Sequence, residues 1–163
     1  MYDLTKNFMI KLEEKWGEKN LEMGWTAIPT ALFLLQSELK LSSIQFNVLL
    51  NIILHWWGKD WPHPSQKSIA HRIGVSPKTV QRAILSIEEM GLIKKQRTSR
   101  ENRKYNGRNV YDLTPLIQQL ETLIPVAKDL YLKDKSANLW RRLALNSPLR
   151  HLLDLLMVTH LYI

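Results

Sequence analysis

Eleven basic side chains lie between residues 65 and 108 of this 163-residue chain, where only three acidic residues accompany them. The segment therefore carries the whole formal net charge of +8, because the remaining residues hold equal numbers of basic and acidic side chains. Lysine and arginine bind phosphate oxygens, and arginine also matches the acceptors of a guanine edge. A basic face on an otherwise neutral chain is typical of a protein that binds a polyanion.

Other kinds of chemistry find little support in the composition. The chain has no cysteine, which excludes disulfides and thiolate metal sites. His55, His63 and His71 stand eight residues apart, a spacing that fits no common metal site, and no phosphate-binding loop or nucleophile elbow is present. We therefore expect no enzyme activity, no cofactor and no metal.

The apolar residues also bear on location. No run approaches the ~18 apolar residues of a membrane span, and charged residues interrupt the N-terminal segment where a signal peptide would be apolar. We expect a protein without membrane contact that is cytoplasmic and associated with the nucleoid.

The first forty residues are expected to be helical. Apolar residues recur every four positions from Leu4 to Trp16, which predicts an amphipathic helix over about 4–19. Thr30 is expected to cap a second apolar helix that runs to about Leu39.

A central helix follows this extension. Ser42 and Gln45 have the spacing of a capping box, and an apolar stripe runs from Phe46 to Trp57. The helix is expected to end at Gly58. Residues 61–64, Trp-Pro-His-Pro, must then be extended, because each proline disfavours helix in the residue before it.

Two further helices are joined by a short turn. Ser65 is expected to cap a helix over 66–73, which Gly74 ends. Ser76 is expected to cap the next helix, about 77–90, whose first residue is a proline. Its apolar residues share one face: Val80, Ala83, Ile84 and Ile87.

A hairpin and more helix complete the pattern. Residues 92–98 and 108–113 read as two strands around a polar loop with an Asn106-Gly107 turn. Thr114-Pro115 opens another helix that is interrupted near Pro125, and residues 148–163 are densely apolar.

Helix, glycine-containing turn, helix and two-stranded hairpin is the layout of a winged helix-turn-helix. The segment from Ser65 to Ile93, SQKSIAHRIGVSPKTVQRAILSIEEMGLI, resembles this DNA-binding family of bacterial and plasmid transcriptional regulators and replication initiators. Gly74-Val75-Ser76 resembles the family turn, and Thr79 to Arg82 resembles the start of its recognition helix. The resemblance covers about residues 25–125.

The resemblance and the helical pattern together predict a mainly α fold with a small β-hairpin. We expect a winged helix-turn-helix with flanking N- and C-terminal helices, divided into a helical extension over 1–40, a DNA-binding domain over 41–114 and a C-terminal helical segment over 115–163.

The predicted DNA contacts fall into four groups. If Val80, Ala83, Ile84 and Ile87 face inward, the residues around Arg82 point outward at 100° per residue. We expect base contacts from Lys78, Gln81 and Arg82, and phosphate contacts from Ser76, Thr79 and Lys95. Helix 66–73 should be braced on the DNA backbone by Lys67, Ser68 and Arg72. The wing should contact DNA through Arg100, Arg103 and Lys104.

The leading hypothesis is a sequence-specific double-stranded DNA-binding protein that regulates transcription, with helix 77–90 in the major groove and a basic wing over 98–108 on the flank. A plasmid or phage replication initiator and a winged helix used as a protein-interaction module remain as alternatives. A homodimer through the N- or C-terminal helices is expected if those segments do not simply pack over the core.

Overall fold

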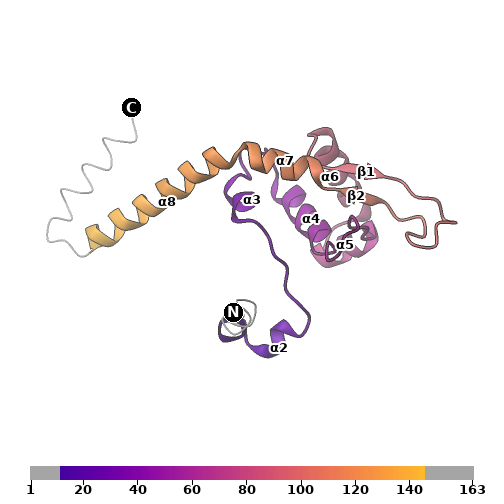
Figure 1. Cartoon of the computed structure of the whole chain (residues 1–163), viewed down its shortest axis with the longest axis horizontal. Helices are drawn as coiled ribbons and strands as arrows, with labels where there is room; N and C mark the ends of the chain where they lie inside the picture. Colours follow the sequence, from indigo (N-terminus) through magenta and orange to yellow (C-terminus); the bar gives the residue numbers. More distant parts are fainter. Residues whose placement is uncertain (1–11, 146–163) are drawn as a thin grey trace, which may run out of the picture.

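The part of the chain described by the computed structural model is residues 12–145. It begins with a helical turn over 12–16, then α2 (Glu18–Leu21) and α3 (Thr30–Leu34), and α2 lies apart from the other helices (Figure 1). The prediction of one helix over 4–19 is wrong in its described part, because Gly17 has a positive φ of 76° that interrupts the helix. Residues 4–11 of that prediction lie outside the described residues.

The second helix differs from its prediction. Pro29, not Thr30, holds the N-cap position of α3, and no side chain caps the helix. The helix is also shorter than expected, because the chain leaves the helical path at Leu35 and continues in turns to Lys40, whose φ is 54°. These turns still bury Leu35 and Leu39, so the segment packs onto the core without forming a continuous helix.

The central helix, α4 (Ser43–Ile53), begins as predicted. The Ser42 backbone N–H donates to Gln45 Oε1 at 2.7 Å while the Gln45 N–H donates to Ser42 Oγ, which completes the capping box. The predicted end at Gly58 is wrong. The N–H groups of the two residues after Leu54 bond three residues back, which tightens the last turn, and Trp57 is 63% exposed and not part of the apolar stripe.

The next two helices confirm their predicted caps. α5 (Gln66–Ile73) has Ser65 Oγ accepting from the Ser68 N–H, and Gly74 follows in the left-handed conformation with φ 70°. α6 (Pro77–Glu89) has Ser76 Oγ accepting from the Thr79 N–H at 3.1 Å. The three helices α4, α5 and α6 pack against one another.

The hairpin consists of two three-residue strands, β1 (Lys94–Gln96) and β2 (Val110–Asp112), paired antiparallel with Lys95 opposite Tyr111. Both strands are shorter than predicted. Beyond Gln96 the Arg108 carbonyl accepts a hydrogen bond from the Thr98 hydroxyl at 2.7 Å, in place of a backbone N–H. The extended segment 61–64 lies on the other side of β2, where the Tyr111 N–H donates to the Pro62 carbonyl at 2.9 Å.

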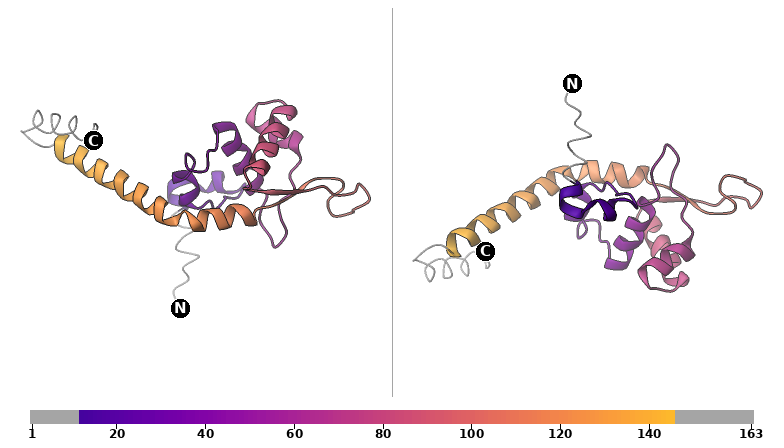
Figure 2. Two further views of the ribbon diagram at one scale, coloured as in Figure 1. Left: turned by 90° about the horizontal axis from the view of Figure 1, so that it is seen from above. Right: turned by 90° about the horizontal axis from the view of Figure 1, so that it is seen from below.

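Two helices follow the hairpin, α7 (Thr114–Thr122) and α8 (Ile124–Leu145). The predicted interruption is confirmed, and Pro125 lies in the first turn of α8, where a missing N–H costs nothing. α8 contacts α3 and α7 and then projects away, so that it and the hairpin form opposite ends of the described chain (Figures 1 and 2). The apolar segment 148–163 lies outside the described residues.

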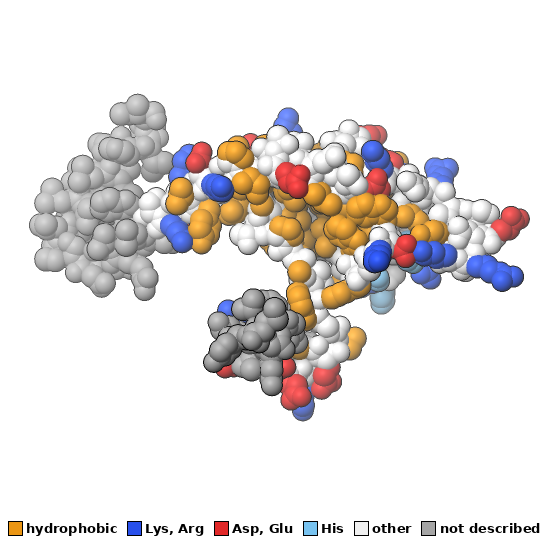
Figure 3. Space-filling view, in the orientation of Figure 1, with side chains coloured by type: hydrophobic (Ala, Val, Ile, Leu, Met, Phe, Trp, Pro, Cys, Tyr) orange, Lys and Arg blue, Asp and Glu red, His pale blue; other side chains and the backbone are white. Residues whose placement is uncertain are grey.

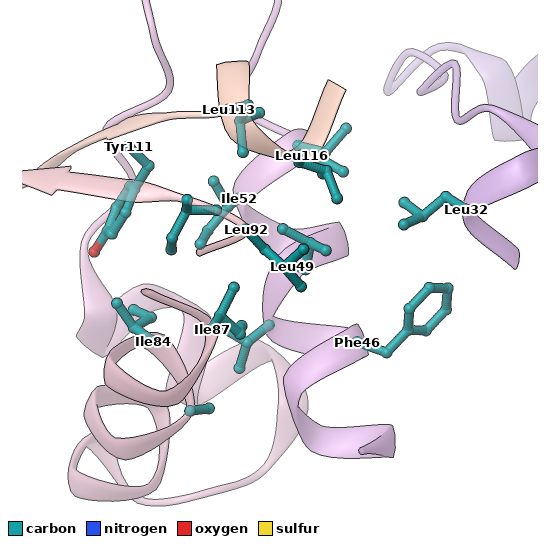
Figure 4. Close-up of a cluster of buried hydrophobic side chains, with 14 of the residues drawn as sticks. Leu32, Phe46, Leu49, Ile52, Ile84, Ile87, Leu92, Tyr111, Leu113 and Leu116 are labelled. Atoms are coloured by element: carbon teal, nitrogen blue, oxygen red, sulfur yellow. The ribbon is translucent and has the colours of Figure 1, made fainter. Parts of the chain in front are cut away.

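One apolar core joins these elements. It receives side chains from α3, α4, α5, α6, the hairpin and α7, and Ile52, Ile84 and Ile87 are fully buried within it (Figure 4). Tyr111 is also fully buried, and its hydroxyl accepts from Gln66 Nε2 at 3.4 Å. This core fixes the positions of α5, α6 and the hairpin relative to one another. None of the helices within residues 12–145 is long and apolar enough to cross a membrane.

Candidate nucleic-acid interface

The two faces of α6 differ as the sequence predicted. Val80, Ile84 and Ile87 are fully buried against the core, which sets the rotation of the helix about its axis. The opposite face therefore presents its side chains to solvent: Lys78, Gln81, Arg82, Leu85 and Glu89. The N-terminal half of this face is basic and rich in hydrogen-bonding groups.

The two hydroxyls at the start of α6 already have partners. Ser76 Oγ caps the helix and lies 2.9 Å from Thr79 Oγ1. Pro77 has no N–H, and the Thr79 and Val80 N–H groups bond to Ser76, which leaves the Lys78 N–H at this end of the helix, where the helix dipole favours an anion. Ser76 and Thr79 thus act first as structural residues that hold the start of the helix.

On α5, the predicted brace residues Lys67, Ser68 and Arg72 are all exposed. The Arg72 guanidinium donates from Nε to Asn51 Oδ1 at 2.8 Å and from Nη1 to Ser68 Oγ at 3.0 Å. Its Nη2 lies 3.1 Å from His55 Nε2. Arg72 therefore connects α5 to the C-terminal end of α4 and is held in one orientation.

The hairpin loop carries the predicted wing residues Arg100, Arg103 and Lys104, all of them exposed. The loop is ordered by Asn102, whose Oδ1 accepts from two backbone N–H groups, and by positive φ angles at the predicted Asn106-Gly107 turn. Basic side chains project from this end of the molecule (Figure 3).

The wing is tied to the 60–63 segment by two contacts. Lys104 Nζ lies 2.7 Å from Asp60 Oδ1, and this hydrogen bond raises the pKa of the Lys104 ammonium. The Tyr105 ring makes an edge contact with His63 at a centroid distance of 5.1 Å. Both contacts orient the wing relative to the helices.

Lys95 differs from the other predicted contacts. Its ammonium lies 2.8 Å from Glu88 Oε2, and only 12% of its side chain is exposed. The Lys95 backbone N–H also donates to the same carboxylate, and the side-chain hydrogen bond lowers the pKa of Glu88. This pair joins β1 to the end of α6, which leaves the Lys95 ammonium occupied.

Sequence reasoning missed three polar residues that contribute to this surface: Asn51, His55 and Asp60. Asn51 lies in the last turn of α4 and His55 in the turn that follows it, and neither has a charge that would have drawn notice. Within residues 12–145, no group of three or more His, Asp or Glu side chains is arranged to hold a metal ion.

Residues 39–93 match a protein family described as a helix-turn-helix domain, and the match spans α4, α5 and α6. This part of the chain has the fold of a helix-turn-helix. With the β1–β2 hairpin after it, the fold is a winged helix-turn-helix, mainly α with one small hairpin, as the sequence predicted. The expected domain boundaries after residues 40 and 114 stay predictions.

Several solved structures are similar over most of the chain. The transcriptional regulator PA3341 has 17% sequence identity over 96% of this chain and 94% of its own, with a TM-score of 0.40. MarR has 19% identity over 98% and 94%, and BldR from Sulfolobus solfataricus has 18% identity over 100% of both chains, each with a TM-score of 0.40. No curated protein of similar sequence matches the chain.

The pairing of Lys95 gives a prediction for the helix-turn-helix domain. Replacing Lys95 with Met keeps the length of the side chain but removes the ion pair with Glu88, and we expect it to lower the free energy of unfolding by roughly 1 kcal/mol. The salt dependence of DNA binding should not change, because the ammonium is not available to a phosphate. Urea denaturation and a salt titration test the two parts, and a shallower salt slope would restore Lys95 as a phosphate contact.

Proposed function

We propose that this chain is a sequence-specific double-stranded DNA-binding protein that acts as a transcriptional regulator. The observation that carries the proposal is the outward face of α6, where Lys78, Gln81 and Arg82 are exposed together while the opposite face is buried in the core. An α-helix fits the major groove, and these side-chain types match the donors and acceptors of base edges there.

Each element has a separate role in this arrangement. The start of α6 enters the major groove, with Arg82 or Lys78 on guanine and Gln81 on adenine. Ser76 and Thr79 place the helix end against a phosphate, and Lys67, Ser68 and Arg72 brace α5 on the backbone. Leu85, which is 40% exposed, is available for an apolar contact with thymine methyl groups.

The hairpin supplies contacts beside the groove. Arg100 and Arg103 have no ion-pair partner among the described residues, while Lys104 is paired with Asp60. Exposed arginines on a hairpin suit phosphates or a narrow minor groove. No observation favours a replication initiator, and a protein-interaction module would have no need for the concentrated basic charge.

Selection from a random duplex pool tests sequence specificity. We expect one enriched site, for which Arg82→Ala costs about 1–3 kcal/mol while binding to an unrelated duplex changes little. Equal losses on every duplex would reduce Arg82 to a phosphate contact, and a pool without enrichment would contradict sequence-specific recognition.

A homodimer would let the domain read two half-sites. The support lies in α8, which projects from the domain with Val126, Tyr131 and Leu132 exposed. We propose that the N- or C-terminal helices form the dimer interface. We also propose that the protein acts in the cytoplasm, on the DNA of the nucleoid. Light scattering across a wide concentration range should give the mass of a dimer, and a constant monomer mass would contradict it.

A further inference from the structure

A cluster of polar and basic side chains lies where α5 meets the end of α4 and the turn after it, outside the contacts so far assigned to α6 and the wing. Its centre is the Arg72 guanidinium, which bonds Asn51, Ser68 and His55. Three of its five N–H groups are used in these bonds, and the other two make no bond to any part of the chain that the structure describes. The guanidinium is thus oriented before any ligand arrives, with donors to spare.

The contact between Arg72 and His55 determines the protonation of the imidazole. A guanidinium can only donate, so His55 Nε2 must accept, and the ring is neutral in this arrangement. Partial burial lowers the pKa of His55, and electrostatic interactions with Arg72, His63 and Arg108 lower it further. These neighbours come from three segments: α5, the 61–64 segment and the end of the hairpin loop before β2.

The cluster has no counter-charge among the described residues. In residues 12–145 the ion pairs are Lys95 with Glu88 and Lys104 with Asp60, so neither Arg72 nor Arg108 has a carboxylate within ion-pair distance. Histidine side chains lie exposed beside lysine and arginine at the base of the hairpin (Figure 3). Oriented cationic donors without an acidic partner are the chemistry of an anion site.

We propose that His55 and Arg72 bind one backbone phosphate of DNA and that His55 takes up a proton from solvent when they do so. On protonation, His55 Nε2 changes from an acceptor to a donor, so the Arg72–His55 hydrogen bond is lost and both groups can donate to phosphate oxygens. The phosphate charge offsets the repulsion between the two cations. This proposal rests on DNA binding as the proposed function and adds a phosphate contact at the junction of α4 and α5.

Proton uptake gives the binding a definite pH dependence. If the pKa of His55 is higher in the complex than in the free protein, affinity rises as the pH falls through the pKa of the complex. It stops rising below the pKa of the free protein. Each unit of difference between the two pKa values contributes a tenfold change in the dissociation constant.

The test is a set of DNA titrations by fluorescence anisotropy at fixed ionic strength, between pH ~8 and ~6, where histidine titrates. His55→Gln is the informative variant, because the amide oxygen can still accept from Arg72 but does not titrate in this range. His71→Gln is the matched control, since His71 is an exposed histidine on α5 outside the cluster. The affinity of the unchanged protein should rise about tenfold or more as the pH falls.

The outcomes separate this proposal from the proposed function. We expect His55→Gln to lose the rise in affinity between pH ~8 and ~6, and His71→Gln to keep it. An unchanged pH dependence in His55→Gln, or none in the unchanged protein, would overturn the phosphate site and leave DNA binding intact. Failure of the unchanged protein to bind DNA at any pH would overturn both.

Discussion

Replacing Arg100, Arg103 and Lys104 with alanine is expected to weaken DNA binding by roughly 10- to 1,000-fold at physiological salt. Each phosphate contact contributes a slope of about −0.9 to the dependence of log affinity on log salt, so three lost contacts should make the slope shallower by up to about 2.7. Lys104 must give up its ion pair with Asp60 before it can bind a phosphate. If it contributes little for this reason, the loss of affinity should be nearer to tenfold.

The matched control for the wing variant removes the same charge elsewhere. Lys128, Lys133 and Lys135 are exposed on α8, which projects away from the hairpin. Changing these three to alanine lowers the net charge equally but should leave the salt slope nearly unchanged. Equal losses in the two triple variants would mean that net charge alone drives binding and that the wing makes no localised contact.

The largest effect on stability is expected from Ile84→Ala. Ile84 is fully buried between α6 and the rest of the core (Figure 4), so truncation loses apolar contacts and leaves a cavity. We expect a loss of about 2–5 kcal/mol in the free energy of unfolding, a large part of the ~5–15 kcal/mol available to a domain of this kind. Urea denaturation followed by circular dichroism measures it.

The residue after Ile84 provides the control. Leu85 is in the same helix but is 40% exposed, so Leu85→Ala should change the stability much less, by roughly 0.5 kcal/mol. If the two variants lost equal stability, the rotation of α6 that exposes Arg82 and its neighbours would be wrong.

The parts of the fold that sequence predicted are those set by local chemistry. Ser42, Ser65 and Ser76 each cap the helix they were expected to cap, and Gly74 adopts the left-handed conformation that its turn requires. The apolar spacing within α6 predicted its buried face for the same reason, because helix geometry alone fixes which side chains share a side.

The features that sequence could not provide depend on contacts between distant segments. Lys95 pairs with Glu88 because β1 returns alongside the end of α6, and nothing near Lys95 in the sequence distinguishes it from a free lysine. The Arg72 bonds with Asn51 and His55 likewise depend on how α5 packs on α4. The early end of α4 follows from a tightened last turn and from Trp56 packing against Trp61, with ring centroids 5.2 Å apart.

The most direct test of the central proposal is a titration of the unchanged protein against a mixed-sequence DNA duplex, followed by fluorescence anisotropy over a series of salt concentrations. With two exposed arginines on the wing and basic residues along α5 and α6, we expect log affinity to fall linearly with log salt, with a slope of about −4 or steeper. Absence of binding even at low salt would contradict the account, because the basic surface of the winged helix-turn-helix would then serve another partner.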